Sequence, residues 1–192
     1  WGPDSRFGVL EGVVRTRVGY AGGDYPNPTY DDLGDHAECV QLDFDPGTVS
    51  FGELLGCFFE FHDPTLPPWS RQYASLILFH GTAQKKEAGK RMAHPFSASM
   101  PVLTQIRPYT GFTRAEGYHQ KFRLRQDPVL LRILKKLYPD WEALVDSTLA
   151  ARLNGVLAGY GKTPESMEEL SRLGLPPEAL DRVRAVLAGR FY

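Results

Sequence analysis

The chain has 192 residues, of which 42% are hydrophobic and 23% are charged, which is typical of a globular protein with a buried core and excludes a wholly disordered chain. Lysines and arginines (22) nearly balance aspartates and glutamates (23), and no apolar run approaches the roughly 20 residues of a membrane span, so we expect neither nucleic acid nor membrane as a partner. The two cysteines, Cys39 and Cys57, are too few for a disulfide framework and favour a reducing compartment, so we predict a cytoplasmic protein.

The first part of the chain, to about residue 122, alternates strand-like and helix-like segments. A β-branched run predicts a strand over 13–18 that ends at Gly19, and alternation of apolar and polar residues predicts another over 40–44. Ser50 and Glu53 form a capping box before a helix with apolar residues at helical spacing. Three further elements are predicted: a buried strand over 76–79, a polar helix over 82–91 and a strand over 102–106. Strands that alternate with helices indicate an α/β or α+β fold.

The remainder, residues 123–192, has only helical patterns. Asp127 before Pro128 predicts the start of a helix that runs to about residue 137. Further helices are predicted over 148–157, from Thr163 to Gly174, and over 176–189. We expect this part to be a helical extension that either packs on the first part or forms a small subdomain.

A long segment over 19–36 is rich in Gly, Pro, Asn, Asp and Tyr and has no periodicity, which is typical of a functional loop. Four tyrosines stand in loop contexts: Tyr20, Tyr25, Tyr30 and Tyr73. Glu38 follows the loop, just before the alternating strand, and a carboxyl group in an aromatic pocket has a raised pKa and can hold a proton near neutrality. On the residues alone, a second interpretation stays open, in which the tyrosines are ordinary amphipathic residues and Glu38 is a solvated charge.

The five histidines are scattered and include no pair at i, i+4, so we predict no metal site: His36, His62, His80, His94 and His119. The sequence also contains no phosphate-binding loop and no nucleophile elbow.

Short motifs follow one another along residues 1–122: Trp1-Gly2-Pro3, residues 12–23, Asn27-Pro28-Thr29-Tyr30, His36-Ala37-Glu38, Phe59-Glu60-Phe61-His62-Asp63-Pro64-Thr65, Arg71-Gln72-Tyr73-Ala74-Ser75 and Ala115-Glu116-Gly117-Tyr118-His119-Gln120. Together they resemble the methionine sulfoxide reductase A family. The resemblance implies an α+β fold, a two-layer sandwich with a mixed sheet, flanking helices and a ferredoxin-like core. It also implies a catalytic domain over 1–122, with residues 123–192 as a C-terminal helical extension.

The family reduces the S epimer of methionine sulfoxide, free or in proteins, as repair after oxidative stress. Its signature is Gly-Cys-Phe-Trp-Gly, whose end matches Trp1-Gly2. The resemblance therefore places the nucleophile, a cysteine or selenocysteine, two residues before Trp1, which makes the protein a selenoprotein candidate. A helix over 3–10 would lower the pKa of that thiol. The product is a sulfenic acid, so we expect thioredoxin, a glutaredoxin-type protein or another thiol as reductant, and no bound cofactor.

The resemblance also implies roles for individual residues. Glu38 aligns with the acid that protonates the sulfoxide oxygen, and Tyr30 and Tyr73 align with the tyrosines that hydrogen-bond this oxygen. Trp1 aligns with the indole that packs on the S-methyl group. Tyr20 and His119 are expected to support substrate binding, although a structural role of His119 is an equal alternative.

Three departures from the family pattern stand out. The loop between Tyr30 and Glu38 is short, residues 67–71 replace the usual Gly-Asn-Asp, and residues 123–192 contain no cysteine that could resolve the sulfenic acid. We interpret Cys39 and Cys57 as structural, so regeneration would depend on an external thiol. Two other functions stay open: a catalytically inactive protein that binds sulfoxides, and a helical tail that docks a partner.

Overall fold

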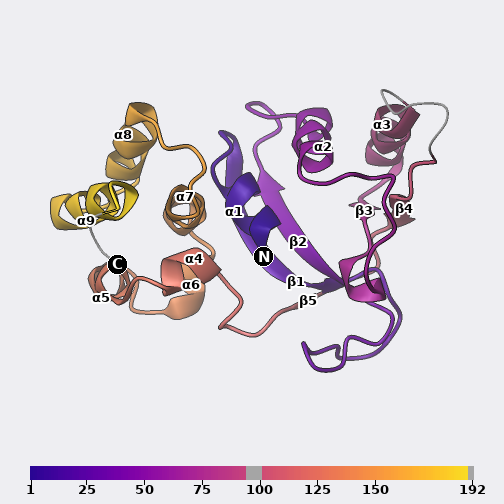
Figure 1. The fold of residues 1–192 in the computed structure, drawn as a ribbon, viewed down its shortest axis with the longest axis horizontal. Helices are drawn as coiled ribbons and strands as arrows, with labels where there is room; N and C mark the ends of the chain where they lie inside the picture. Colours follow the sequence, from indigo (N-terminus) through magenta and orange to yellow (C-terminus); the bar gives the residue numbers. More distant parts are fainter. Residues whose placement is uncertain (94–100, 190–192) are drawn as a thin grey trace. The chain divides into compact units, whose positions relative to one another are not determined.

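The computed structural model describes residues 1–93 and 101–189, so His94 lies outside the described residues (Figure 1). The N-terminal part contains α1 (Gly2–Gly8), β1 (Val13–Ala21), β2 (Ala37–Phe44), α2 (Phe51–Glu60), the 3-10 helix η1 (Arg71–Tyr73), β3 (Leu76–Phe79), α3 (Thr82–Ala93), β4 (Gln105–Pro108) and β5 (Phe112–Arg114). The C-terminal part contains α4 (Phe122–Arg125), α5 (Pro128–Leu137), α6 (Trp141–Val145), α7 (Thr148–Leu157), α8 (Pro164–Arg172) and α9 (Pro177–Leu187). The predicted α+β class is confirmed.

The chain divides into two compact units. Unit 1 contains Trp1–Arg17, Leu42–Asp45 and Gly117–Tyr192, and unit 2 contains Val18–Gln41 and Pro46–Glu116. The sequence predicted a catalytic domain over 1–122 and a helical extension over 123–192. These two functional assignments stay predictions.

Strands of both orientations occur, in two sheets. One sheet has the order β2-β1-β5, with β1 and β5 antiparallel, and in the other β3 and β4 are parallel. The ferredoxin-like order stays a prediction. Strand β1 does not end at Gly19, because Gly19, Tyr20 and Ala21 pair with the three residues of β5. Strand β4 begins only at Gln105, three residues later than the predicted start at 102, and the backbone N–H of Leu103 donates instead to the carbonyl oxygen of Pro64 at 2.7 Å.

In unit 2, helices α2 and α3 pack on each other, and α3 also packs on strands β3 and β4 (Figure 1). The centre of this packing is a cluster of Leu55, Ile77 and Ala88. The capping box is confirmed: the Ser50 hydroxyl accepts from the backbone N–H of Glu53 at 3.2 Å, and the Glu53 carboxylate accepts from the backbone N–H of Ser50 at 2.8 Å. The capping therefore fixes the start of α2 locally, and the apolar cluster holds the helix on the unit.

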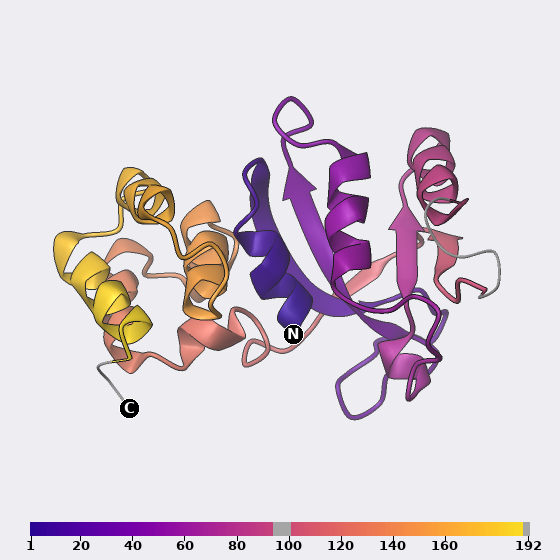
Figure 2. The ribbon, with the colours of Figure 1, turned by 45° about the horizontal axis from the view of Figure 1, so that its top comes forward.

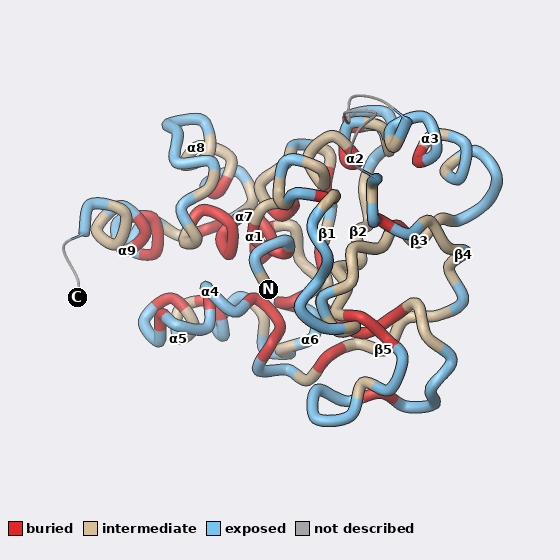
Figure 3. The backbone as a smooth tube through the Cα atoms, turned by 45° about the vertical axis from the view of Figure 1, so that its right-hand side comes forward, coloured by how far each residue is buried: buried red, intermediate tan, exposed pale blue. Residues whose placement is uncertain are grey.

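In unit 1, helix α7 is the central element. All its residues from Leu149 to Val156 are buried, and α1, α4, α6, α8 and α9 all contact it (Figure 3). The surrounding apolar core contains leucines from α5, α6, α8 and α9. Helices α5 and α7 have the predicted bounds, and Asp127 caps α5 by accepting from two backbone N–H groups. The leucine pattern of the tail is thus explained by packing inside unit 1 rather than by an exposed apolar face.

None of the helices among residues 1–93 and 101–189 is both long and apolar enough to cross a membrane.

Candidate active site

Glu38 lies inside β2, not before the strand as predicted, and is half-buried. The side-chain amide of Gln72 donates to Glu38 Oε1 at 2.5 Å. Gln72 belongs to η1, directly before Tyr73. The hydrogen bond therefore fixes the orientation of the Glu38 carboxyl group and joins it to the element that carries Tyr73.

The phenol of Tyr73 is about half exposed, and the negative charge of Glu38 is the main cause that raises its pKa. Desolvation and the neighbouring Tyr30 raise the pKa further. Glu38 and Tyr30, the other two predicted catalytic residues, thus both lie close enough to Tyr73 to influence its pKa. A phenol with a raised pKa keeps its proton at neutral pH, so Tyr73 can donate a hydrogen bond to an oxygen atom.

Tyr30 lies in a tight turn that Glu116 holds in place. The backbone N–H of Tyr30 donates to Glu116 Oε1 at 3.1 Å, and the hydroxyl of Tyr20 donates to Glu116 Oε2 at 2.6 Å. Tyr20 is only 1% exposed, so its observed role is to support Glu116. A contact of Tyr20 with substrate stays a prediction.

The predicted loop is held by Asp35 and Arg71. The Asp35 carboxylate accepts from the backbone N–H groups of Tyr25 and Asp24, and these hydrogen bonds lower its pKa. Arg71 Nε donates to the carbonyl oxygen of Asp35 at 2.8 Å, and its Nη2 donates to that of Gly22 at 3.0 Å. Arg71 therefore connects η1 to the loop.

Two further predicted residues meet in unit 1. The indole Nε1–H of Trp1 donates to His119 Nδ1 at 2.7 Å, and the two ring centroids are 4.7 Å apart. Because Nδ1 accepts, the His119 ring in this arrangement is neutral with its proton on Nε2. His119 is buried, and the centroid of its ring lies 4.1 Å from that of the Tyr118 ring. The structure therefore brings Trp1 and His119 together within unit 1, and Glu38, Tyr30 and Tyr73 together within unit 2.

Both cysteines have raised pKa values. Desolvation raises the pKa of Cys39 in β2 to about 12. Desolvation is also the main cause that raises the pKa of Cys57 in α2, with the charge of Glu60 second. A thiol reacts as its thiolate, so neither group is activated at neutral pH.

Gln72, Glu116 and Arg71 are the supporting residues that the sequence did not reveal. Each acts through partners between 34 and 96 residues away in the sequence. Their only signal was a position inside the motifs around Tyr73 and His119, which identifies a region but not a hydrogen bond.

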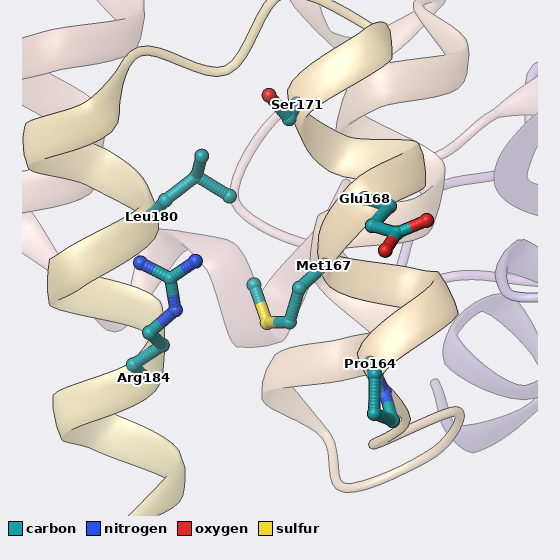
Figure 4. Close-up of a pocket in the computed structure, with 6 residues that line it drawn as sticks. All are labelled: Pro164, Met167, Glu168, Ser171, Leu180 and Arg184. Atoms are coloured by element: carbon teal, nitrogen blue, oxygen red, sulfur yellow. The ribbon is translucent and has the colours of Figure 1, made fainter.

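In the part of the chain that the structure describes, no three His, Cys, Asp or Glu side chains are arranged to hold a metal ion. A pocket of about 410 Å³ lies between α8 and α9 and is lined by Pro164, Met167, Glu168, Ser171, Leu180 and Arg184 (Figure 4). The pocket contains neither a thiol nor a histidine, and none of the predicted site residues, so we do not assign it to the chemistry.

Comparison with known proteins identifies relatives of this chain. The sequence model of the family described as peptide methionine sulfoxide reductase matches residues 1–142. A peptide methionine sulfoxide reductase of Drosophila melanogaster is 42% identical over 180 residues, covering 92% of this chain and 72% of that protein. Peptide methionine sulfoxide reductase A5 of Oryza sativa is 38% identical and covers 92% of this chain and 74% of the relative.

Solved structures agree at the level of the fold. Methionine sulfoxide reductase A of Corynebacterium diphtheriae superposes with a TM-score of 0.58 at 31% identity, over 67% of this chain and 70% of that one. Mxr1 from Saccharomyces cerevisiae in its reduced form gives a TM-score of 0.55 at 26% identity, over 67% of this chain and 80% of that one. With a family match over residues 1–142 and relatives matched over most of their length, the chain belongs to the peptide methionine sulfoxide reductase family.

Proposed function

We propose that the protein reduces the S epimer of methionine sulfoxide, free or within proteins, to methionine. The observation that carries the proposal is the grouping of Glu38, Tyr30 and Tyr73 in unit 2, where Gln72, directly before Tyr73 in η1, donates a hydrogen bond to the Glu38 carboxyl group. A sulfoxide oxygen leaves only after protonation, and a carboxylic acid assisted by two phenols supplies the proton and the polarisation.

The reaction needs a thiol or selenol nucleophile, which the resemblance places two residues before Trp1. Its sulfur or selenium attacks the sulfoxide sulfur and takes over the oxygen. The sulfoxide is reduced to a sulfide, and the nucleophile is oxidised to a sulfenic or selenenic acid. Glu38 delivers the proton that the departing oxygen requires.

In unit 1, we assign Trp1 to recognition of the S-methyl group, because its indole is an apolar surface of fixed orientation. The hydrogen bond to His119 at 2.7 Å fixes that orientation. His119 would then act through Trp1, which is the supporting role that the sequence suggested.

We further propose that the sulfenic or selenenic acid is reduced by an external dithiol, which is thioredoxin or a glutaredoxin-type protein. The two thiols reduce the sulfenic or selenenic acid to the original thiol or selenol, become a disulfide themselves and release water, so no bound cofactor is needed. The raised pKa values of Cys39 and Cys57 make both poor resolving thiols. A cytoplasmic location follows from the low cysteine count alone and is proposed on that basis.

The direct test is the Glu38→Gln variant of the native chain, including the residues before Trp1. Turnover of the S epimer with dithiothreitol should fall about 10²–10⁴-fold, because the glutamine amide cannot act as a general acid. Glu60→Gln, an exposed carboxylate of the same unit, is the matched control and should leave turnover unchanged. Unchanged turnover in Glu38→Gln would remove Glu38 from the mechanism.

Mass-spectrometric sequencing of the native N-terminal peptide identifies the residue two positions before Trp1. A cysteine or selenocysteine there agrees with the proposal. Another residue, together with binding of methionine sulfoxide but no turnover, would favour the inactive binding protein.

A further inference from the structure

The N-terminal helix α1 has a position that it cannot maintain by itself. It has seven residues, among them Gly2, Pro3 and Gly8, and an isolated helix of this length is not stable in water. Asp4, Ser5, Phe7 and Gly8 are nevertheless buried. The place of α1, and of Trp1 at its N-cap, is therefore set by the elements that pack against it.

Helix α7 of the C-terminal extension is packed directly against the backbone of α1, and the two helices lie side by side in both ribbon views (Figures 1 and 2). A Cβ atom on Gly155 would lie 2.4 Å from the carbonyl oxygen of Ser5. A Cβ atom on Gly8 would lie 2.5 Å from the carbonyl oxygen of Ala151. The close approach therefore depends on a glycine in each helix.

Asn154 of α7 makes polar contacts with the first turn of α1. Its Nδ2 donates to Asp4 Oδ2 at 3.2 Å and to Ser5 Oγ at 3.0 Å. Its Oδ1 accepts from the backbone N–H groups of Arg123 and Leu124, at 2.9 and 3.1 Å. Asn154 is 1% exposed, so these partners replace the water that the amide would otherwise bind.

Arg152 of α7 holds the other end of α1. Its Nη1 donates to the carbonyl oxygen of Gly8 at 2.6 Å, one of the carbonyls that a helix C-terminus leaves without a partner in the helix. Its Nε donates to Glu169 of α8 at 2.7 Å. One helix of the extension thus contacts α1 at both of its ends.

The same Asp4 carboxylate also contacts the segment that carries His119. Lys121, two residues after His119, is fully buried, and its Nζ lies 3.2 Å from Asp4 Oδ1 and 2.5 Å from the carbonyl oxygen of Thr16. Asp4 therefore connects α7, through Asn154, to both partners of the hydrogen bond between Trp1 and His119.

We propose that Asn154 and Arg152 are positioning residues for Trp1, so that α7 is a working part of the enzyme and not a docking module; this inference rests on the proposed function. The family match ends at residue 142, before α7. The match to the Drosophila relative covers 92% of the chain and leaves only about 15 residues outside, so it includes α7. Helix α7 thus lies beyond the region that the family model matches, but within the region that the Drosophila relative matches.

The test compares Asn154→Leu with Val183→Ala in the native chain. Asn154→Leu removes all four hydrogen bonds and keeps the number and branching of the side-chain heavy atoms. Val183 is buried in the same core, in α9, and makes none of these hydrogen bonds, so Val183→Ala controls for lost packing. The readouts are kcat/KM for methionine-S-sulfoxide and the Trp1 indole N–H signal in a ¹⁵N-correlated NMR spectrum, to which each of the three tryptophans of residues 1–192 contributes one indole signal.

Asn154→Leu should shift the Trp1 indole signal and lower kcat/KM about 10- to 100-fold, because displacement of a substrate-positioning group by about 1 Å has an effect of that size. Val183→Ala should leave both nearly unchanged. If Asn154→Leu does not fold, Ser5→Ala, which removes a single acceptor, should shift the same signal by less. An unshifted Trp1 signal in the variant that folds would overturn the inference, whereas absence of turnover in the unmodified native protein would overturn the proposed function instead.

Discussion

Replacing Gly155 with alanine is expected to disturb the contact between α7 and α1, and the structure gives the size of the effect. The new Cβ atom would lie 2.4 Å both from the carbonyl oxygen of Ser5 and from Cγ1 of Val9. Relief to van der Waals separation requires a movement of about 1 Å. Overpacking of this kind costs about 1–3 kcal/mol of stability. Alanine also gains about 1 kcal/mol over glycine within a helix, so the net loss is about 0–2 kcal/mol.

Gly89 is the matched control because it also lies inside a helix, α3, but an added Cβ atom there would meet nothing within 4 Å. Gly89→Ala should therefore stabilise the protein by about 0.5–1 kcal/mol. The intrinsic gain of alanine cancels in the comparison, so the two variants should differ by about 1–3 kcal/mol. Urea unfolding followed by circular dichroism measures both values. If Gly155→Ala were as stabilising as Gly89→Ala, α1 and α7 would not be in the close contact that we describe.

Three further predictions concern unit 2. Gln72→Leu should lower kcat about 10- to 100-fold with little change in stability, because it releases the Glu38 carboxyl group from its orientation; steady-state kinetics measures this, and unchanged kcat would contradict it. The pKa of Cys39 is raised from 9.0 to about 12, so the folded state holds this proton more tightly than the unfolded state, and the resulting stability, complete below pH 9, is lost as the pH rises from 9 towards 12. Urea unfolding between pH 8 and 10.5 measures how steeply the free energy of unfolding falls with pH. Above pH 9 this fall should be about 1.4 kcal/mol per pH unit smaller in Cys39→Ala than in the unchanged protein, and identical slopes in the two proteins would argue against a desolvated thiol. Arg71→Lys should raise KM and speed proteolysis within residues 22–35, because lysine cannot donate to two carbonyl oxygens in the fixed geometry of arginine. Equal cleavage rates in the two proteins would show that Arg71 does not hold this loop in place.

The elements that the sequence predicted well have their determinants close by in the chain. The capping box of Ser50 and Glu53 and the N-cap Asp127 fix helix starts through contacts within three residues, so α2 and α5 begin where predicted. Strand β5 has three residues and exists because Gly19, Tyr20 and Ala21 pair with it across the chain. No local pattern indicates such a partner, and for the same reason β1 was predicted to stop too early.

The candidate site divides in the same way. The motifs identified Glu38, Tyr30, Tyr73, Trp1 and His119 as candidates, and the structure groups them within their units. The hydrogen bonds that orient them join residues 34, 86 and 118 positions apart. These bonds depend on tertiary folding, so only the structure could show which polar residues support which candidate.

Unit 1 takes its residues from both ends of the chain, and this has a consequence during protein synthesis. Helix α1 leaves the ribosome well before α7, which begins only at Thr148. At a translation rate of about 5–20 residues per second, the interval between them is roughly 7–30 s. During this time α1 lacks α7, the helix that packs directly against its backbone. The nascent chain therefore cannot hold the pair of Trp1 and His119 in this way until α7 has been translated, and a chain that terminates before α7 would not acquire it.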